Sequence, residues 1–195
     1  MSELVPAVGA RPRPRSRSRS FPLRGLLFLA LAILVVVADQ ITKRLAVQRL
    51  ERTGVRSVPV PGAGDMLRFT YVENRGAAFG LLQDQTVFFV LVGLVVIGVI
   101  AASYRYLPRS GFRVHLALGL QLGGAVGNLI DRVRQGYVVD FVDFGYHSNW
   151  WPVFNVADSA ICVGVALLAL NLLTGSEPEP EREQEPPPGG PDARN

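Results

Sequence analysis

The sequence lacks several features on which common classes of enzyme and secreted protein are built. It contains one cysteine, Cys162, so an internal disulfide and a CxxC metal site are both excluded. Its two histidines, His115 and His147, form no HExxH motif, and no GxSxG motif occurs. Only 18% of the residues are charged and 49% are hydrophobic, which suggests a membrane protein.

Four apolar segments give the main structural signal. A membrane-spanning helix needs about 20 mostly apolar residues. We expect four such helices, in Leu23–Ala38 with a continuation to about Val47, Thr86–Ser103, Val114–Ile130 and Val153–Leu173. The first segment follows a basic stretch, as in a cleaved signal peptide. No A-x-A-like cleavage site follows it, so we interpret it as a retained helix.

The two ends of the chain differ from the apolar middle and from each other. Residues 1–22 form a basic arm rich in proline and serine, and residues 175–195 form an acidic, proline-rich tail. Neither end has the composition of a packed core, so we predict that both are disordered. The membrane domain is then expected to cover residues 23–174.

Arginine distribution predicts how the helices are oriented. The amino-terminal arm and the short connection that carries Arg105, Arg109 and Arg113 are basic, which places both on the cytoplasmic side. With four spans, both termini are cytoplasmic. The connections at about 48–85 and 131–152 then face outward, although the first of them also holds several arginines.

The first outward connection has the pattern of a small β-structure. Turn residues at Pro59–Gly64 precede the alternating stretch MLRFTYV, so we predict an all-α membrane fold with a β-containing extracytoplasmic subdomain, residues 48–85, between helices 1 and 2. The GAGD sequence that begins at Gly62 resembles a motif of presenilin-type intramembrane proteases, but its place in a turn argues against that role. Trp150 and Trp151 are typical of an interfacial aromatic belt.

Asp158 is the carboxylate for which the sequence makes the strongest functional case. A last helix beginning after Asp158 would rise only about 22 Å, less than the roughly 30 Å hydrocarbon core. A helix that begins near Asn155 fits better, with Asn155 as its cap and Asp158 one turn in on the same face. Asp158 is then either a capping-box partner or functional, and intramembrane carboxylates are usually functional.

The partner of Asp158 is left open by spacing. NLID and NVAD share an N-x-x-D pattern, which favours Asp131, while Asp140 and Asp143 in VVDFVDF are nearly equal candidates. In an extended strand, residues three apart point to opposite faces, so only one of Asp140 and Asp143 can meet Asp158.

Other polar residues form short motifs beside the apolar segments. Asp39 and Lys43 lie four apart and are expected to form an ion pair or to bind a polar group of a substrate. Asn74 precedes small residues that permit close approach of backbone to a ligand, or that form a tight turn. Small residues around Gly124 suit close helix packing, and Asn128, Asp131 and Arg132 share a helix face.

Five motifs occur in order among the four apolar segments: DQITK, ENRGAAFG, GGAVGNLIDRV, GYVVDF and FNVADSA. Together they resemble lipoprotein signal peptidase, also called signal peptidase II, over roughly Leu23–Leu173. The resemblance implies a membrane aspartic endopeptidase without a cofactor or metal. Its expected substrates are bacterial prolipoproteins, cut just before a diacylglyceryl-modified cysteine. It also implies a bacterial inner-membrane location with the site on the extracytoplasmic face.

The resemblance also selects residues. It implies Asp140 and Asp158 as the catalytic dyad, so the choice of Asp140 rests on the family motif. The supporting or substrate-binding positions that it implies are Asp39, Lys43, Asn74, Gly76, Ala77, Gly124, Asn128, Asp131, Arg132, Asn155 and Ala157. A four-helix transporter or proton channel would also use intramembrane carboxylates. The clustering of most carboxylates on one membrane face argues against it, as does their absence from Thr86–Ser103.

Overall fold

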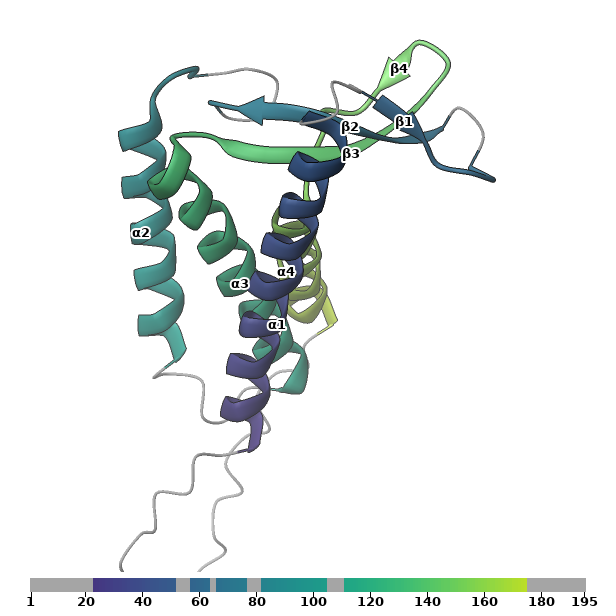
Figure 1. The fold of residues 1–195 in the computed structure, drawn as a ribbon. Coiled ribbons are helices and arrows are strands. Elements are labelled where there is room, and N and C mark those ends of the chain that lie inside the picture. Colours follow the sequence, from purple (N-terminus) through teal and green to yellow (C-terminus); the bar gives the residue numbers. More distant parts are fainter. Residues whose placement is uncertain (1–22, 52–56, 64–65, 77–81, 105–110, 175–195) are drawn as a thin grey trace, which may run out of the picture.

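The computed structural model describes residues 23–51, 57–63, 66–76, 82–104 and 111–174. In these ranges, four α-helices form a bundle and a small antiparallel sheet covers one end of it (Figure 1). The predicted arm and tail lie outside the described residues, as do Ala77 and the arginines Arg105 and Arg109.

The helices match the predicted segments closely. α1 covers Leu23–Ala46 and continues as a π-helical turn, η1, over Val47–Glu51. α2 covers Thr86–Tyr104, α3 Phe112–Gln135 and α4 Val156–Thr174. The apolar segments that contain α1, α2 and α4 are long and apolar enough to cross a membrane, which agrees with a multi-pass membrane protein.

α3 lies at the centre of the bundle and contacts the three other helices. Its glycines permit this, because a Cβ at Gly123 would lie 2.7 Å from the carbonyl oxygen of Ala32 in α1. A Cβ at Gly124 would overlap the carbonyl oxygen of Ala157 in α4. The predicted role of these small residues in close helix packing is therefore confirmed.

The sheet corrects one prediction. β1 (Ser57–Pro59) and β2 (Leu67–Asn74) come from the first connection, as expected. β3 (Val138–Tyr146) and β4 (Asn149–Trp150), however, come from the connection between α3 and α4. The strands lie in the order β1-β2-β3-β4, so the sheet is not confined to the segment between helices 1 and 2. The prediction was wrong here because strand pairing joins residues far apart in the sequence, which local alternation cannot reveal.

The end of α3 directs the chain into the sheet. Gly136 adopts a left-handed conformation with φ of 82°, and its N–H donates to the carbonyl oxygen of Arg132. Glycine adopts this conformation without steric cost and commonly ends helices in this way. β3 therefore begins immediately beside the polar end of α3. Because α3 extends to Gln135, Asp131 is a helical residue rather than part of the connection.

Candidate active site

A cavity of about 750 Å³ lies where the sheet meets the first turns of α4. Asp140 of β3 and Asp158 of α4 both line it, together with Asn74 of β2 and Arg132 of α3. Its walls are otherwise largely apolar, with residues Trp151 to Phe154 at one part and Ile161, Cys162 and Val163 along α4. The cavity thus brings the carboxyl groups of Asp140 and Asp158 to one recess, whose lining also includes the ion pair of Glu73 and Arg75.

The first turn of α4 holds Asp158 by two reciprocal hydrogen bonds. The N–H of Asp158 donates to Oδ1 of Asn155 at 2.9 Å, and the N–H of Asn155 donates to Oδ2 of Asp158 at 3.2 Å. This is the arrangement of a capping box, in which two unpaired helical N–H groups are satisfied at once. Asn155 is therefore the cap and Asp158 lies one turn in, as the helix-length argument predicts. The cap leaves Oδ1 of Asp158 to accept from Nδ2 of Asn128 at 2.8 Å.

Asp140 lies on the neighbouring strand and is almost fully buried, with 1% of its surface exposed. Its Oδ1 accepts a hydrogen bond from Nδ2 of Asn155 at 2.6 Å, and its Oδ2 accepts one from Nδ2 of Asn74 at 2.9 Å. Asn155 therefore contacts both carboxyl groups, Asp158 through its backbone N–H and Asp140 through its side chain.

Three asparagine amides have fixed orientations at this site. The carbonyl oxygens of the side chains of Asn74, Asn155 and Asn128 accept from the N–H of Gly76, the N–H of Asp158 and Nζ of Lys43, respectively. Because each oxygen is occupied by a donor, each NH₂ group must turn toward a carboxylate. The two carboxyl groups are thus held in place by donors that are themselves held in place.

The electrostatic setting makes the carboxyl group of Asp140 easier to protonate than that of an ordinary aspartate. Burial and, second to it, the nearby charge of Asp158 raise the pKa of Asp140 to about 7, although hydrogen bonds from Asn74 and Asn155 act in the opposite direction. Desolvation disfavours the charged form, and a like charge nearby does the same. Two neighbouring carboxyl groups of this kind can share one proton near neutral pH.

A buried ionic cluster lies next to the two carboxyl groups. Nζ of Lys43 lies 2.9 Å from Oδ2 of Asp39, 2.9 Å from Oδ2 of Asp131 and 2.9 Å from Oδ1 of Asn128. Asp39 accepts from the N–H of Ala157 in α4, and Asp131 accepts from the N–H of Val139 in β3. The cluster therefore connects α1, α3, α4 and β3 immediately beside the two carboxyl groups.

Comparison with known proteins identifies a family to which the chain is similar. A family model described as signal peptidase (SPase) II matches residues 31–174. A lipoprotein signal peptidase from Moorella thermoacetica is 47% identical over 159 residues, which cover 82% of this chain and 99% of the relative. One from Caldanaerobacter subterraneus is 50% identical over 134 residues, which cover 69% of this chain and 87% of the relative.

The chain belongs to the signal peptidase II family. It is therefore a protease of the membrane, as its sequence motifs indicate. A solved bacterial membrane enzyme at 2.3 Å resolution is similar to it with a TM-score of 0.66 and 30% identity. That likeness covers 82% of this chain and 94% of the other.

The residues that the signal peptidase II motifs select lie close together in this structure. One hydrogen-bonded network contains ten of them: Asp39, Lys43, Asn74, Gly76, Asn128, Asp131, Asp140, Asn155, Ala157 and Asp158. Gly76 donates to Asn74 from its backbone, and Gly124 packs against Ala157. Arg132 lines the cavity, with its guanidinium 5.1 Å from the ring centroid of Phe89 in α2. Ala77 lies outside the described residues.

The other two carboxylates that spacing left open have different partners. Asp143 accepts from Nε of Arg68 and from the hydroxyl of Thr70, both at 2.9 Å. Asp131 accepts from Lys43, from Gln40 at 2.9 Å and from the N–H of Val139. The shared N-x-x-D pattern therefore does not reflect a shared environment, because Asp131 faces α1 and β3, whereas Asp158 faces Asn128.

Sequence reasoning missed Gln40, which donates to Asp131 at 2.9 Å and to Asp39 at 3.3 Å. Its position next to Asp39 in DQITK was the available signal.

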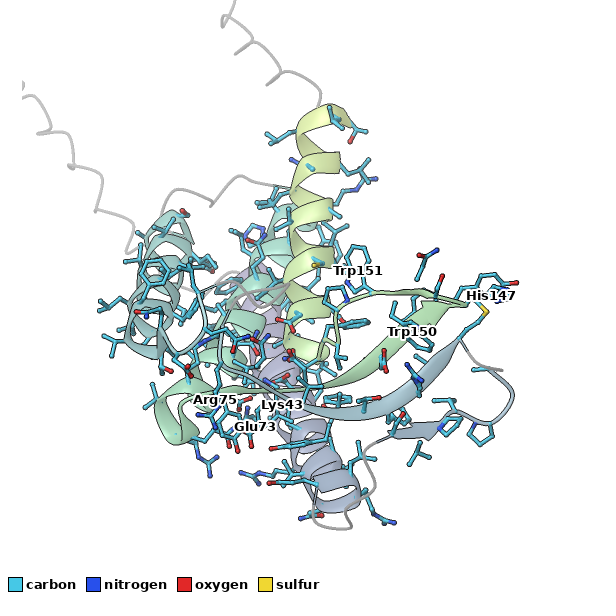
Figure 2. All side chains as sticks on the ribbon, turned by 90° about the horizontal axis from the view of Figure 1, so that it is seen from above. Lys43, Glu73, Arg75, His147, Trp150 and Trp151 are labelled. Carbon is cyan, nitrogen blue, oxygen red and sulfur yellow. The ribbon has the colours of Figure 1, made fainter. Side chains whose placement is uncertain are left out.

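The two tryptophans of the predicted aromatic belt differ from each other in their surroundings. Trp150 is on the hairpin that carries His147, and the guanidinium carbon of Arg68 lies 3.5 Å from the centroid of its ring. Trp151 is 64% exposed and lines the cavity beside α4 (Figure 2).

Proposed function

We propose that this protease removes signal peptides from bacterial prolipoproteins by cleaving before the diacylglyceryl-modified cysteine, with Asp140 and Asp158 as its catalytic dyad. The observation that carries the proposal is the pair of carboxyl groups that line one apolar cavity and share contacts with Asn155. The names of the relatives support the substrate class.

In the proposed mechanism, the two carboxyl groups share one proton. The ionised group takes a proton from a water molecule, and that water attacks the scissile carbonyl carbon. The protonated group polarises the carbonyl oxygen and afterwards gives a proton to the leaving amine. The pair titrates as a unit, so the proton belongs to the dyad rather than to one residue. Asn74, Asn128 and Asn155 keep both carboxyl groups in position throughout.

We further propose a topology of four membrane spans with both termini in the cytoplasm and the dyad at the extracytoplasmic face of the inner membrane. α3 is the least apolar of the four helices, and its buried Asn128 and Asp131 bond to groups of α1, α4 and β3. The basic arm and the arginine-rich connection before α3 support this orientation. Asp158 lies in the first turn of α4, so the dyad would lie at the membrane surface, where a lipid-anchored cysteine holds its peptide bond.

Cleavage of a lipid-modified precursor tests this function. With purified protein in detergent, we expect a diacylglyceryl-modified prolipoprotein to be cut before its modified cysteine, and the unmodified precursor to remain intact over the same time. The lipid contributes binding energy away from the reacting bond, and such energy serves to position that bond. Mass spectrometry of both products identifies the bond. Equal cleavage of both precursors, or a cut elsewhere, would overturn the proposed substrate class.

The pKa of Asp140 predicts how turnover depends on pH. Because that pKa is raised to about 7, the dyad keeps its shared proton below pH 7 and loses it above. We expect turnover to fall by roughly tenfold per pH unit well above pH 7, since the required acid is then deprotonated. Initial rates from pH 5 to 9 check this, with the thermal midpoint recorded at each pH as a control for unfolding. A rate that stays constant up to pH 9 in folded protein contradicts the shared proton.

A further inference from the structure

A second cavity of about 500 Å³ lies on the opposite face of β3 from Asp140. It is lined on one side by the last turns of α1 and by η1, and on the other side by one residue each from β1, β2 and β3. The lining residues are Thr42, Leu45, Ala46, Arg49, Leu50, Val58, Phe69 and Phe141. This volume lies within the range of small-molecule sites, about 300–1,000 Å³.

This second cavity, a groove between α1 and the sheet, is separate from the first cavity, which holds Asp140 and Asp158 and is called the dyad cavity below. The two cavities share no lining residue, and β3 divides them. Asp140 and Phe141 are neighbours on β3, so their side chains point to opposite faces of the sheet. Asp140 lines the dyad cavity and Phe141 lines the groove. A substrate whose scissile bond lies at the dyad would have to pass β3 to fill the groove, which disfavours a lipid chain of the substrate as its occupant.

The chemistry of the groove matches a membrane lipid with a negatively charged headgroup. Its lining is apolar except for Thr42 and Arg49, and three of the lining residues, Leu45, Val58 and Phe69, are each more than 40% exposed. The groove lies at the end of the apolar segment Gly25–Glu51, where a spanning helix leaves the hydrocarbon for the headgroup layer. An acyl chain fits the apolar part, and Arg49 complements a phosphate.

We propose that this groove binds one anionic phospholipid, with an acyl chain against Phe69 and Phe141 and its phosphate on Arg49. A guanidinium has five N–H donors, so Arg49 can bind phosphate while it keeps contacts within the protein. The bound chain packs against the back of the strand that carries Asp140. Lipid binding therefore stabilises the folded protein and the position of β3, independently of which substrate the dyad cleaves.

Lipid retention in native mass spectrometry tests the site directly. After exchange from mixed bilayers into mild detergent, we expect wild-type protein to retain one phosphatidylglycerol in preference to phosphatidylcholine. Arg49→Gln should bind phosphatidylglycerol at least about tenfold more weakly, as expected for the loss of a charge-assisted hydrogen bond. Arg44→Gln is the matched control, because Arg44 is exposed on the last turn of α1 and does not line the groove. It should retain the lipid as the wild type does.

A second variant tests the acyl-chain part of the site. Val58→Trp adds bulk at the exposed rim on β1 and should displace the lipid without disturbing the buried residues of the groove. Equal retention of both lipids by the wild type would overturn the proposal, as would unchanged retention in Arg49→Gln. If these variants instead alter only the KM for a lipid-modified precursor, the groove serves the substrate and the proposed occupant is wrong. Retention is read without turnover, so failure of the dyad assignment leaves this test intact.

Discussion

Lys43→Met is expected to destabilise the protein by about 3–5 kcal/mol, the usual cost of removing one member of a buried ion pair. Lys43 has only 4% of its side chain exposed and contacts Asp39 and Asp131 at 2.9 Å each. Without the ammonium group, two carboxylates remain buried against each other and against Gln40. The same change removes the Lys43 donor to Oδ1 of Asn128, so the amide that holds Asp158 loses its orientation.

Thermal unfolding in detergent measures this effect, and initial rates measured below the unfolding midpoint report the loss at the dyad. Arg44→Met is the matched control, since Arg44 lies on the same helical turn but is exposed, and it should behave as the wild type. Adding Asp131→Asn to Lys43→Met removes one of the unpaired charges and should restore part of the stability. A Lys43→Met protein within 1 kcal/mol of the wild type would show that the cluster does not hold the helices together.

Local sequence patterns predicted the parts of this structure that depend on near neighbours. The helices follow from apolar runs, and the capping arrangement of Asn155 and Asp158 follows from the length that α4 needs. The i, i+4 spacing of Asp39 and Lys43 likewise made an ion pair one of two expected roles, and the structure shows that pair. In each of these cases, the residues that interact lie within about one helical turn of each other.

The remaining features depend on pairing between distant segments. Alternation along β3 showed that only one of Asp140 and Asp143 could face Asp158, but not which one. The register of β3 against β2 decides this, because it places Asp140 opposite Val72, where Asn74 reaches it, and Asp143 opposite Arg68. Neither that register nor the contact between Asp131 and Lys43, which are 88 positions apart, leaves a signal in the local sequence. For the choice of Asp140, the family motif supplied what spacing could not.

Asp140→Asn and Asp158→Asn are each expected to abolish measurable turnover, a loss of more than about 1,000-fold. Asparagine has nearly the shape of aspartate, but it can neither take a proton from water nor donate one from a carboxyl group. At Asp158, an amide oxygen can still accept from the N–H of Asn155, so α4 should keep its cap. Both variants keep one acceptor oxygen and should fold, but each places an NH₂ group against a donor that the carboxylate accepted, so some loss of stability is expected.

Asp143→Asn is the matched control for this pair. It lies three residues from Asp140 on the same strand and is also buried, but its partners are Arg68 and Thr70 rather than the dyad. We expect this variant to lose some stability and to keep its turnover within a few-fold of the wild type. The comparison separates the loss of a catalytic carboxyl group from the general cost of altering β3.

The most direct measurement is single-turnover cleavage of a diacylglyceryl-modified prolipoprotein by the wild type, Asp140→Asn, Asp158→Asn and Asp143→Asn, each shown to be folded. The dyad predicts cleavage before the modified cysteine by the wild type and Asp143→Asn, and none by the other two. Near-normal cleavage by Asp140→Asn or Asp158→Asn would contradict it, and complete loss in folded Asp143→Asn would show that the wrong aspartate of β3 was assigned to the dyad.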